Sequence, residues 1–283
     1  MEWILINGMM PIIVLMLSLQ SIGINCVQRD NYGCLYTVVK HNSKSDLFLI
    51  DTGYPTTMYD FNNGSLFTNK IIPKTDSWYD VDILRMKHVI KPINEDLTIL
   101  RDVIISGSHR SVNGILGMDV ISDSKIIIDL KSSTIISYDS SPEELRCISG
   151  MKKNSLLSDS SKFVYVKMIV KDEQFCLVVD TGCTHTAVDR KYRYLLSKIE
   201  LTNQKYNGTG KDLPINTETG LIEKANLAGI EKRSLKVLIA DLTSYSFIGS
   251  NIKGHKCIGM LGCDFIIDNS IILDLKNRCA YIK

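Results

Sequence analysis

Short runs of apolar residues alternate along the chain with clusters of Asn, Asp, Ser, Gly and Lys. The runs are rich in Ile, Val, Tyr and Phe, which suit the pleated and partly buried surface of a β-sheet. The polar clusters suit turns. This pattern predicts an all-β chain, with strands at residues 35–39, 47–50, 103–105, 126–130, 134–136, 163–170, 175–179, 235–239 and 271–275.

Helical periodicity is scarce. Residues 187–199 are predicted to form the longest helix, because their apolar side chains recur at helical spacing. Two shorter helices are predicted to begin after Gly117 and Gly262.

The two halves of the chain carry the same landmarks in the same order, which indicates an internal duplication. The copies stand 129 positions apart at the first landmark and 145 apart at the later ones, so the second half has about sixteen extra residues, expected in a loop. The landmarks are Asp-Thr-Gly at 51–53 and 180–182, Gly-x-Leu-Gly-x-Asp at 114–119 and 259–264, and the apolar run ending in Asp-Leu-Lys at 126–131 and 271–276.

The duplication divides the chain into two related lobes. We expect an N-terminal lobe over residues 27–140 and a C-terminal lobe over 162–283, each near the small end of single-domain size. Residues 141–161 are rich in Ser, Lys, Glu and Asp, which predicts a linker between the lobes.

The N-terminus, residues 1–26, is set apart by an almost uncharged apolar stretch over residues 3–19. Ser21-Ile22-Gly23 follows it and fits the cleavage site of an export signal, so an exported protein is predicted, whether periplasmic, secreted or membrane-anchored. Two alternatives stay open: an uncleaved anchor that attaches the protein to a membrane, and a lipidated Cys26.

Composition excludes some classes of partner. The formal charge is +2 and no basic block with interleaved aromatic residues is present, so binding to nucleic acid is not expected. Of the eight cysteines, Cys26 with Cys34 and Cys257 with Cys279 are the first candidates for disulfides. No Cys-x-x-Cys pair is present, so no metal site and no cofactor are predicted.

Asp51 and Asp180 each follow a buried apolar run and precede Thr-Gly. Two carboxylates about 3 Å apart cannot both ionise, so one remains protonated as an acid while the other acts as a base. Such a pair activates water without a covalent intermediate. Gly53 and Gly182 suit this arrangement, because a Cβ would obstruct the tight turn and the approach of the other lobe.

These paired motifs resemble those of the retropepsin-like aspartic peptidases, in the single-chain duplicated form of bacterial members. The resemblance covers roughly residues 35–283. It implies an all-β fold of two pseudo-symmetric retropepsin-like β-barrel lobes, with the active-site cleft between them and β-hairpin flaps that close over an extended polypeptide substrate.

The resemblance also implies roles for individual residues. Asp51 and Asp180 would be catalytic, and Thr52 and Thr181 would each hydrogen-bond to the partner turn. The apolar-apolar-Gly segments 115–117 and 260–262 would pack beneath the two catalytic turns, of which Gly53 and Gly182 are the last residues.

The expected flaps differ between the halves. The second half has a polar, glycine-containing tip with Gly208 and Gly210, whereas the matching stretch of the first half, residues 75–80, has no glycine and contains Trp78. We therefore expect Gly208 and Gly210 to contact the substrate. Two roles stay open for Trp78: a lid that also contacts the substrate, or a side chain in the core.

The predicted function is that of an aspartic endopeptidase. The alternative is a catalytically silent peptide-binding module of the same fold. Because one chain supplies both halves of the site, a monomer is expected. In pepsin-like relatives a Ser or Thr follows each Asp-Thr-Gly and donates a hydrogen bond to the carboxylate, whereas here Tyr54 and Cys183 follow, so an activity optimum nearer neutrality is expected.

Overall fold

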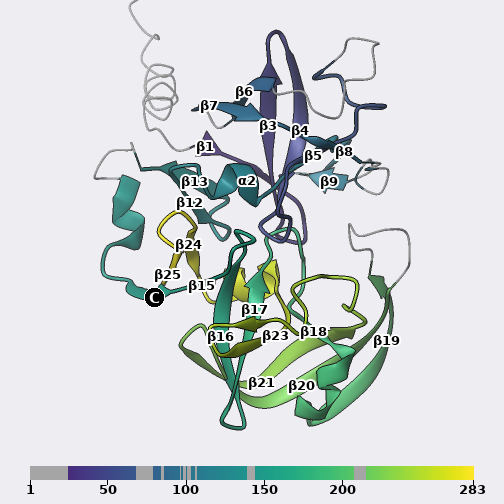
Figure 1. Ribbon diagram of the computed structural model, residues 1–283, viewed down its shortest axis with the longest axis vertical. Coiled ribbons are helices and arrows are strands. Elements are labelled where there is room, and N and C mark those ends of the chain that lie inside the picture. Colours follow the sequence, from purple (N-terminus) through teal and green to yellow (C-terminus); the bar gives the residue numbers. More distant parts are fainter. Residues whose placement is uncertain are drawn as a thin grey trace, which may run out of the picture.

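The structure of the chain is a computed structural model, shown in Figure 1. Among the described residues, β-strands far outnumber helices, and the chain folds into two halves that Figure 1 places one above the other. The predicted all-β architecture of two pseudo-symmetric lobes is confirmed. The described residues are 25–67, 79–83, 86–95, 97, 100, 103–105, 107–138, 144–206 and 215–283.

The second half forms a closed six-stranded barrel. Its strands are ordered β16, β17, β23, β18, β21 and β20, and β20 pairs with β16 to close the ring. Strands β15, β19 and β22 pair onto this ring. The strands are β15 Leu157–Ser158, β16 Val164–Val170, β17 Glu173–Val179, β18 Ala187–Asp189, β19 Lys198–Tyr206, β20 Ile215–Leu227, β21 Ile230–Ala240, β22 Asn251–Ile252 and β23 His255–Leu261.

The first half repeats this ring with one interruption. Strands β7 and β8 correspond to the single long strand β21, and Pro92 separates them, since proline cannot donate to a β-ladder. A small hairpin of β9 and β10 lies beside the ring. The strands are β2 Gln28–Arg29, β3 Leu35–His41, β4 Lys44–Ile50, β5 Met58–Tyr59, β6 Tyr79–Ile83, β7 Met86–Ile90, β8 Ile93–Asn94, β9 Val103–Ile105, β10 Ser108–Arg110 and β11 Gly114–Leu116.

Strand register shows that the sequence duplication is a structural one. In the first half Phe48 of β4 pairs in parallel with Gly114 of β11. In the second half Leu177 of β17 pairs in parallel with Gly259 of β23. Leu177 follows Phe48 by 129 positions and Gly259 follows Gly114 by 145, which are the offsets between the sequence landmarks. Both copies therefore bring the Asp-Thr-Gly turn beside the glycine-containing partner strand.

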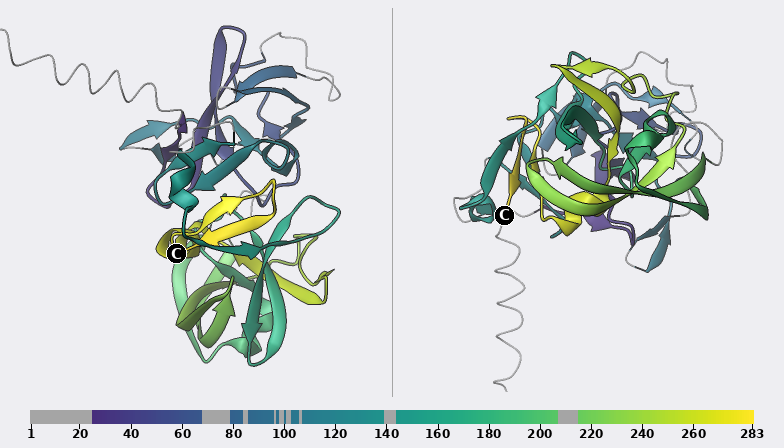
Figure 2. Two further views of the ribbon diagram at one scale, coloured as in Figure 1. Left: turned by 90° about the vertical axis from the view of Figure 1, so that its left-hand side faces the viewer. Right: turned by 90° about the horizontal axis from the view of Figure 1, so that it is seen from below.

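A six-stranded sheet joins the two halves. Its order is β1, β13, β12, β24, β25 and β14, and the central pair, β12 and β24, brings together one strand from each copy. Figure 1 shows these strands at the boundary between the halves, and Figure 2 shows the same boundary from two other sides. The strands are β1 Asn25–Cys26, β12 Ile126–Asp129, β13 Thr134–Ser137, β14 Lys152–Ser155, β24 Ile272–Asp274 and β25 Cys279–Ile282.

The predicted linker, residues 141–161, is shorter in the structure. Residues 152–158 form β14 and β15, which pair with β25 and β16 just as β1 and β2 pair with β13 and β3. The second copy therefore begins near Lys152, ahead of the predicted boundary at 162. Apolar patterning does not reveal these strands, because they are short and β14 is polar and mostly exposed.

The helix predicted over residues 187–199 is wrong. This stretch contains strand β18, the 3-10 helix η3 over Arg190–Leu195, and the beginning of β19. Strand β18 forms because it pairs with both β21 and β23, and such tertiary pairing overrides local periodicity. The two short helices predicted after Gly117 and Gly262 are confirmed as α2 Met118–Ile121 and α3 Cys263–Asp268.

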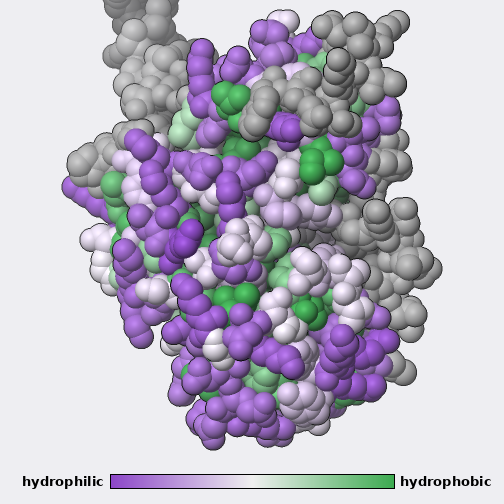
Figure 3. Space-filling model, in the orientation of Figure 1, coloured by the Kyte–Doolittle hydropathy of each residue, from purple (hydrophilic) through white to green (hydrophobic). Residues whose placement is uncertain are grey.

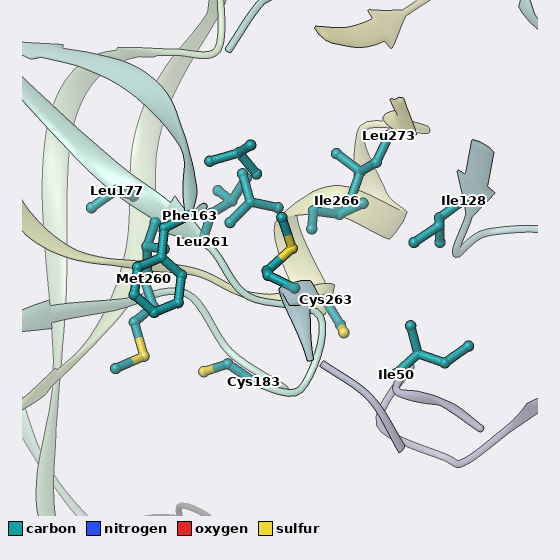
Figure 4. Packing of buried hydrophobic residues seen from close by; sticks show 14 of the residues in the cluster. Ile50, Ile128, Phe163, Leu177, Cys183, Met260, Leu261, Cys263, Ile266 and Leu273 are labelled. Carbon is teal, nitrogen blue, oxygen red and sulfur yellow. The ribbon is translucent and has the colours of Figure 1, made fainter. Parts of the chain in front are cut away.

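One hydrophobic core runs through both halves. Figure 4 shows part of it, in which Ile50 and Ile128 of the first half belong to the same cluster as Cys263, Ile266 and Leu273 of the second. On the face in Figure 3, hydrophilic residues cover most of the surface and hydrophobic ones appear in small separate patches. No helix within the described part of the chain is both long and apolar enough to cross a membrane.

Seven cysteines with described side chains are all free thiols. Neither of the candidate disulfides, Cys26 with Cys34 or Cys257 with Cys279, is formed. Cys257 lies on β23 directly opposite Cys176 on β17, where small buried side chains pack between neighbouring strands, while Cys279 belongs to the sheet that joins the halves.

Candidate active site

Asp51 and Asp180 occupy equivalent places at the ends of β4 and β17. The backbone N–H of Asp51 donates to Leu116 O, and that of Asp180 donates to Leu261 O, both at 3.0 Å. Each aspartate is thereby fixed to the apolar-apolar-Gly segment of its own half. Both side chains are buried, with 2% of Asp51 and 8% of Asp180 exposed.

The glycines of the two turns allow the carboxyl groups to meet. Gly53 N–H donates to Asp51 Oδ1 at 2.8 Å, and Gly182 N–H donates to Asp180 Oδ1 at 3.0 Å. A Cβ on Gly53 would lie 2.7 Å from Asp180 Oδ1, and one on Gly182 would lie 2.8 Å from Asp51 Oδ1, with the rest of each carboxyl group closer still. Only glycine therefore fits either position, and each turn lies against the carboxyl group of the other half.

Thr52 and Thr181 join the two turns by four reciprocal hydrogen bonds. Thr52 N–H donates to Thr181 Oγ1 at 3.2 Å, and Thr181 N–H donates to Thr52 Oγ1 at 3.1 Å. The Thr52 hydroxyl then donates to Val179 O at 2.6 Å, and the Thr181 hydroxyl to Ile50 O at 2.7 Å. Both threonines are completely buried, so this network holds the aspartates in a fixed relative position.

A second pair of threonines supports the turns, and the sequence landmarks do not include it. Thr57 donates through its backbone N–H and its hydroxyl to Asp119 Oδ1, and accepts from Gly117 N–H. In the second half Thr186 makes the same three bonds with Asp264 and Gly262. The signal was present in the sequence, since a threonine stands six positions after each of the two aspartates.

A further repeated pair lies outside the sequence landmarks and was also missed. The Tyr36 hydroxyl donates to Asp30 Oδ2 at 2.8 Å, and the Tyr165 hydroxyl donates to Asp159 Oδ2 at 2.6 Å. Both pairs follow the 129-position offset. No apolar run marks these aspartates, so only an extended comparison of the two halves would have found them.

Burial is the largest influence on the ionisation of the two aspartates. It raises the pKa of Asp51 well above the usual range, and the neighbouring charge of Asp180 raises it further. Burial also raises the pKa of Asp180, to about 6, although hydrogen bonds from Asp51 and from the N–H groups of Gly182 and Cys183 oppose this. The pair therefore retains one shared proton under mildly acidic conditions, and its titration belongs to both carboxyl groups together.

Cys183, which follows the second Asp-Thr-Gly, supports that turn through its backbone. Its Sγ–H donates to His185 O at 3.0 Å, within the same loop. The Cys183 side chain is buried, with 5% exposed. The residue therefore supplies an N–H to Asp180, while its thiol hydrogen bonds to the loop backbone.

A cavity of about 310 Å³ opens above the aspartates and is lined by both halves. The first half contributes both apolar side chains and tyrosines, and the second half contributes Thr184, Tyr245 and Met260 beside the Asp180 turn. The first-half residues include Tyr32, Tyr36, Tyr54, Leu100, Val103 and Ile104. This volume is in the range of sites that hold small ligands or a few residues of a peptide. The arrangement can therefore present a bond of a bound chain to the carboxyl pair.

The predicted flap residues Trp78, Gly208 and Gly210 lie outside the described residues. Strands β19 and β20 pair antiparallel on either side of residues 207–214, so the predicted second-half flap falls between two paired strands. No group of three or more metal-ligating side chains occurs within the described part of the chain.

Comparisons with known proteins found similarity to solved structures, but not to family models or curated sequences. Basic 7S globulin from soybean is similar over 92% of this chain and 94% of its own, with 9% identity and a TM-score of 0.45. A retropepsin-like aspartic protease from Rickettsia conorii is similar over 47% of this chain and 90% of its own, with 14% identity and a TM-score of 0.32. At these identities the likeness concerns the fold.

Proposed function

We propose that this protein is an aspartic endopeptidase, a retropepsin-like enzyme in duplicated single-chain form. The observation that carries the proposal is the buried pair of Asp51 and Asp180, which two copies of one turn bring into contact. The raised pKa values support it, because they give the pair one acid and one base in the same pH range.

The roles follow from the electrostatics. Within the pair, the ionised carboxylate accepts a proton from water, which then attacks a peptide carbonyl carbon. The protonated carboxyl donates to the carbonyl oxygen, and a proton passes to the nitrogen as the C–N bond breaks. Asp51, whose pKa is raised further, is the natural holder of the initial proton, and Asp180 the natural base.

The proposed substrate is an extended polypeptide that lies in the cavity between the halves. Trp78, Gly208 and Gly210 are proposed to cover it, and for the two glycines this agrees with their place in the chain between β19 and β20. We also propose an exported enzyme, on the basis of the apolar N-terminal sequence, with residues 1–24 outside the described part.

The second candidate is a peptide-binding module of the same fold without catalysis. Such a binder would have no chemical need for two carboxyl groups in contact, which favours the enzyme. The deciding experiment incubates the purified full chain with a mixed-peptide library, with and without a pepstatin-type inhibitor. Inhibitor-sensitive cleavage supports the enzyme, whereas peptide retention without cleavage anywhere between about pH 3 and pH 8 supports the binder.

The pH dependence provides a first test of the electrostatics. Because the raised pKa of Asp180 is about 6, we expect optimal activity in the mildly acidic to near-neutral range. In Cys183→Ser, a hydroxyl that donates to the Asp180 carboxylate in place of His185 O would favour the ionised form of the carboxylate and move the acidic limb of the kcat/KM profile to lower pH. An optimum below about pH 3.5 in the parent, or an unmoved acidic limb in the variant, would contradict this expectation.

The state of assembly provides a second test. Both halves of the site come from one chain, so we expect the monomer to be the active species. Activity per molecule should stay constant on dilution from micromolar to nanomolar concentration, with light scattering to report the mass. A steep loss of specific activity on dilution would show that a second chain is needed.

A further inference from the structure

The two walls of the cavity share one backbone turn but carry different side chains there. Leu100 and Tyr245 are equivalent residues, 145 positions apart, and each closes the same turn: Leu100 N–H donates to Leu97 O at 2.8 Å, and Tyr245 N–H donates to Leu242 O at 3.0 Å. Both residues line the cavity with the aspartates. At this one pair of equivalent positions, the two copies of the fold therefore present a hydrocarbon group on one side and a phenol on the other.

The hydroxyl of Tyr245 is available for a ligand. No other residue in the described part of the chain accepts or donates a hydrogen bond at this hydroxyl. The buried Tyr36 and Tyr165 differ, since they donate to aspartates. Tyr245 is half-buried and its ring packs against Phe247, with ring centroids 5.5 Å apart, which restricts its orientation.

The charge of the aspartates affects the ionisation of the Tyr245 hydroxyl. Burial raises the pKa of Tyr245, and the negative charge of Asp180 raises it further, so the hydroxyl keeps its proton at the pH where the pair is active. Tyr245 is thus a neutral hydrogen-bond donor within electrostatic range of the aspartates.

The first-half wall is apolar and open around Leu100. Val103 and Ile104 of β9 line it next to Leu100, and Ile104 is 43% exposed although its side chain is hydrophobic. An exposed apolar side chain in a cavity wall is suited to contact an apolar side chain of a bound chain.

Given the proposed peptidase function, we infer that Tyr245 is a substrate-binding residue that hydrogen-bonds a backbone carbonyl of the peptide and so fixes the direction in which the peptide lies across the aspartates. A two-fold symmetric cleft would bind an extended chain in either direction. Here the donor stands on the second-half side, and the first-half side accepts an apolar side chain through Leu100, Val103 and Ile104. A duplicated chain can specialise its two sides in this way, because each half mutates independently.

The test compares Tyr245→Phe with the parent in steady-state cleavage of defined peptides. The loss of a hydroxyl that meets a peptide carbonyl beside the reacting bond should lower kcat/KM by about 10- to 100-fold and weaken a pepstatin-type inhibitor by a similar factor. The thermal midpoint should stay within about 2 °C, as expected for removal of a hydroxyl with no protein partner. Tyr194→Phe, at a tyrosine that is 58% exposed and outside the cavity, is the matched control and should match the parent in every measurement.

A second measurement tests the direction in which the peptide binds across the aspartates. Cleavage sites in the peptide library are mapped by mass spectrometry for the parent and for the exchange variant with Leu100→Tyr and Tyr245→Leu. We expect the side of the scissile bond that prefers apolar residues to switch in the exchange variant.

The outcomes separate the inference from the proposed function. If the parent shows no cleavage that depends on Asp180, the proposed function fails. If the parent is active but Tyr245→Phe keeps kcat/KM within twofold, the inference alone is overturned. An exchange variant that folds and cleaves with the parent's site preference also overturns it.

Discussion

Replacing either aspartate with asparagine should abolish peptide cleavage. The reaction needs an acid and a base in contact, and an amide can serve as neither, so Asp51→Asn and Asp180→Asn should each lower kcat by at least about 10³-fold. The measurement is single-turnover cleavage of a peptide that the parent processes. The double variant should lose little more than either single variant, because the two groups act as a unit.

The asparagine variants should remain folded, and this serves as the control. A free aspartate ionises above about pH 4, whereas burial raises the pKa of Asp180 to about 6 in the folded chain, so ionisation favours unfolding as the pH rises through this interval. Asparagine has no charge to bury. At about pH 7 the Asp180→Asn variant should therefore unfold at the same temperature as the parent or higher. A folded single variant with parental turnover would show that the pair does not carry the activity.

Adding one methyl group to an Asp-Thr-Gly turn should have nearly as large an effect. In Gly182→Ala the new Cβ would lie 2.8 Å from Asp51 Oδ1 and closer still to Oδ2, inside van der Waals contact, and both groups belong to buried turns that cannot easily move. The carboxyl groups must separate, which should lower kcat/KM by at least about 100-fold because displacements near 1 Å are enough for such losses. Steady-state kinetics and the thermal midpoint measure the two effects separately.

Gly150→Ala is the matched control for that variant. Gly150 has a φ of +76° but open space at the Cβ position, so alanine there introduces backbone strain without a steric clash. We expect it to lower stability by about 1 kcal/mol and leave turnover unchanged. Parental activity in Gly182→Ala would mean that the turns do not approach each other as closely in the working enzyme.

If the protein is a binder without catalysis, the same variants separate the two functions. If the protein is a silent module, the parent and the Asp180→Asn variant should bind peptides with equal affinity at a pH where the pair is protonated. If the protein is an enzyme, the Asp180→Asn variant should still bind a substrate that the parent cleaves, but should no longer cleave it. Fluorescence anisotropy of labelled peptides, measured together with cleavage by the parent, distinguishes these cases.

Features that repeat along the chain or that are local could be predicted from the order of residues. Apolar runs ahead of two Asp-Thr-Gly turns were enough to place Asp51 and Asp180 together, because a duplicated fold related by near two-fold symmetry brings equivalent residues to one axis. The short helices after Gly117 and Gly262 were also predictable, since each follows a fixed landmark.

Features that depend on long-range pairing became visible only in the folded chain. The polar strand β14 forms because β25 offers it an edge, and the stretch after Ala187 becomes β18 because β21 and β23 flank it. The same holds for the cavity. Leu100 and Tyr245 carry no signal in the sequence, and their contrast appears only when the fold sets them at equivalent places around the aspartates, because neither apolar periodicity nor spacing records which distant side chains share a wall.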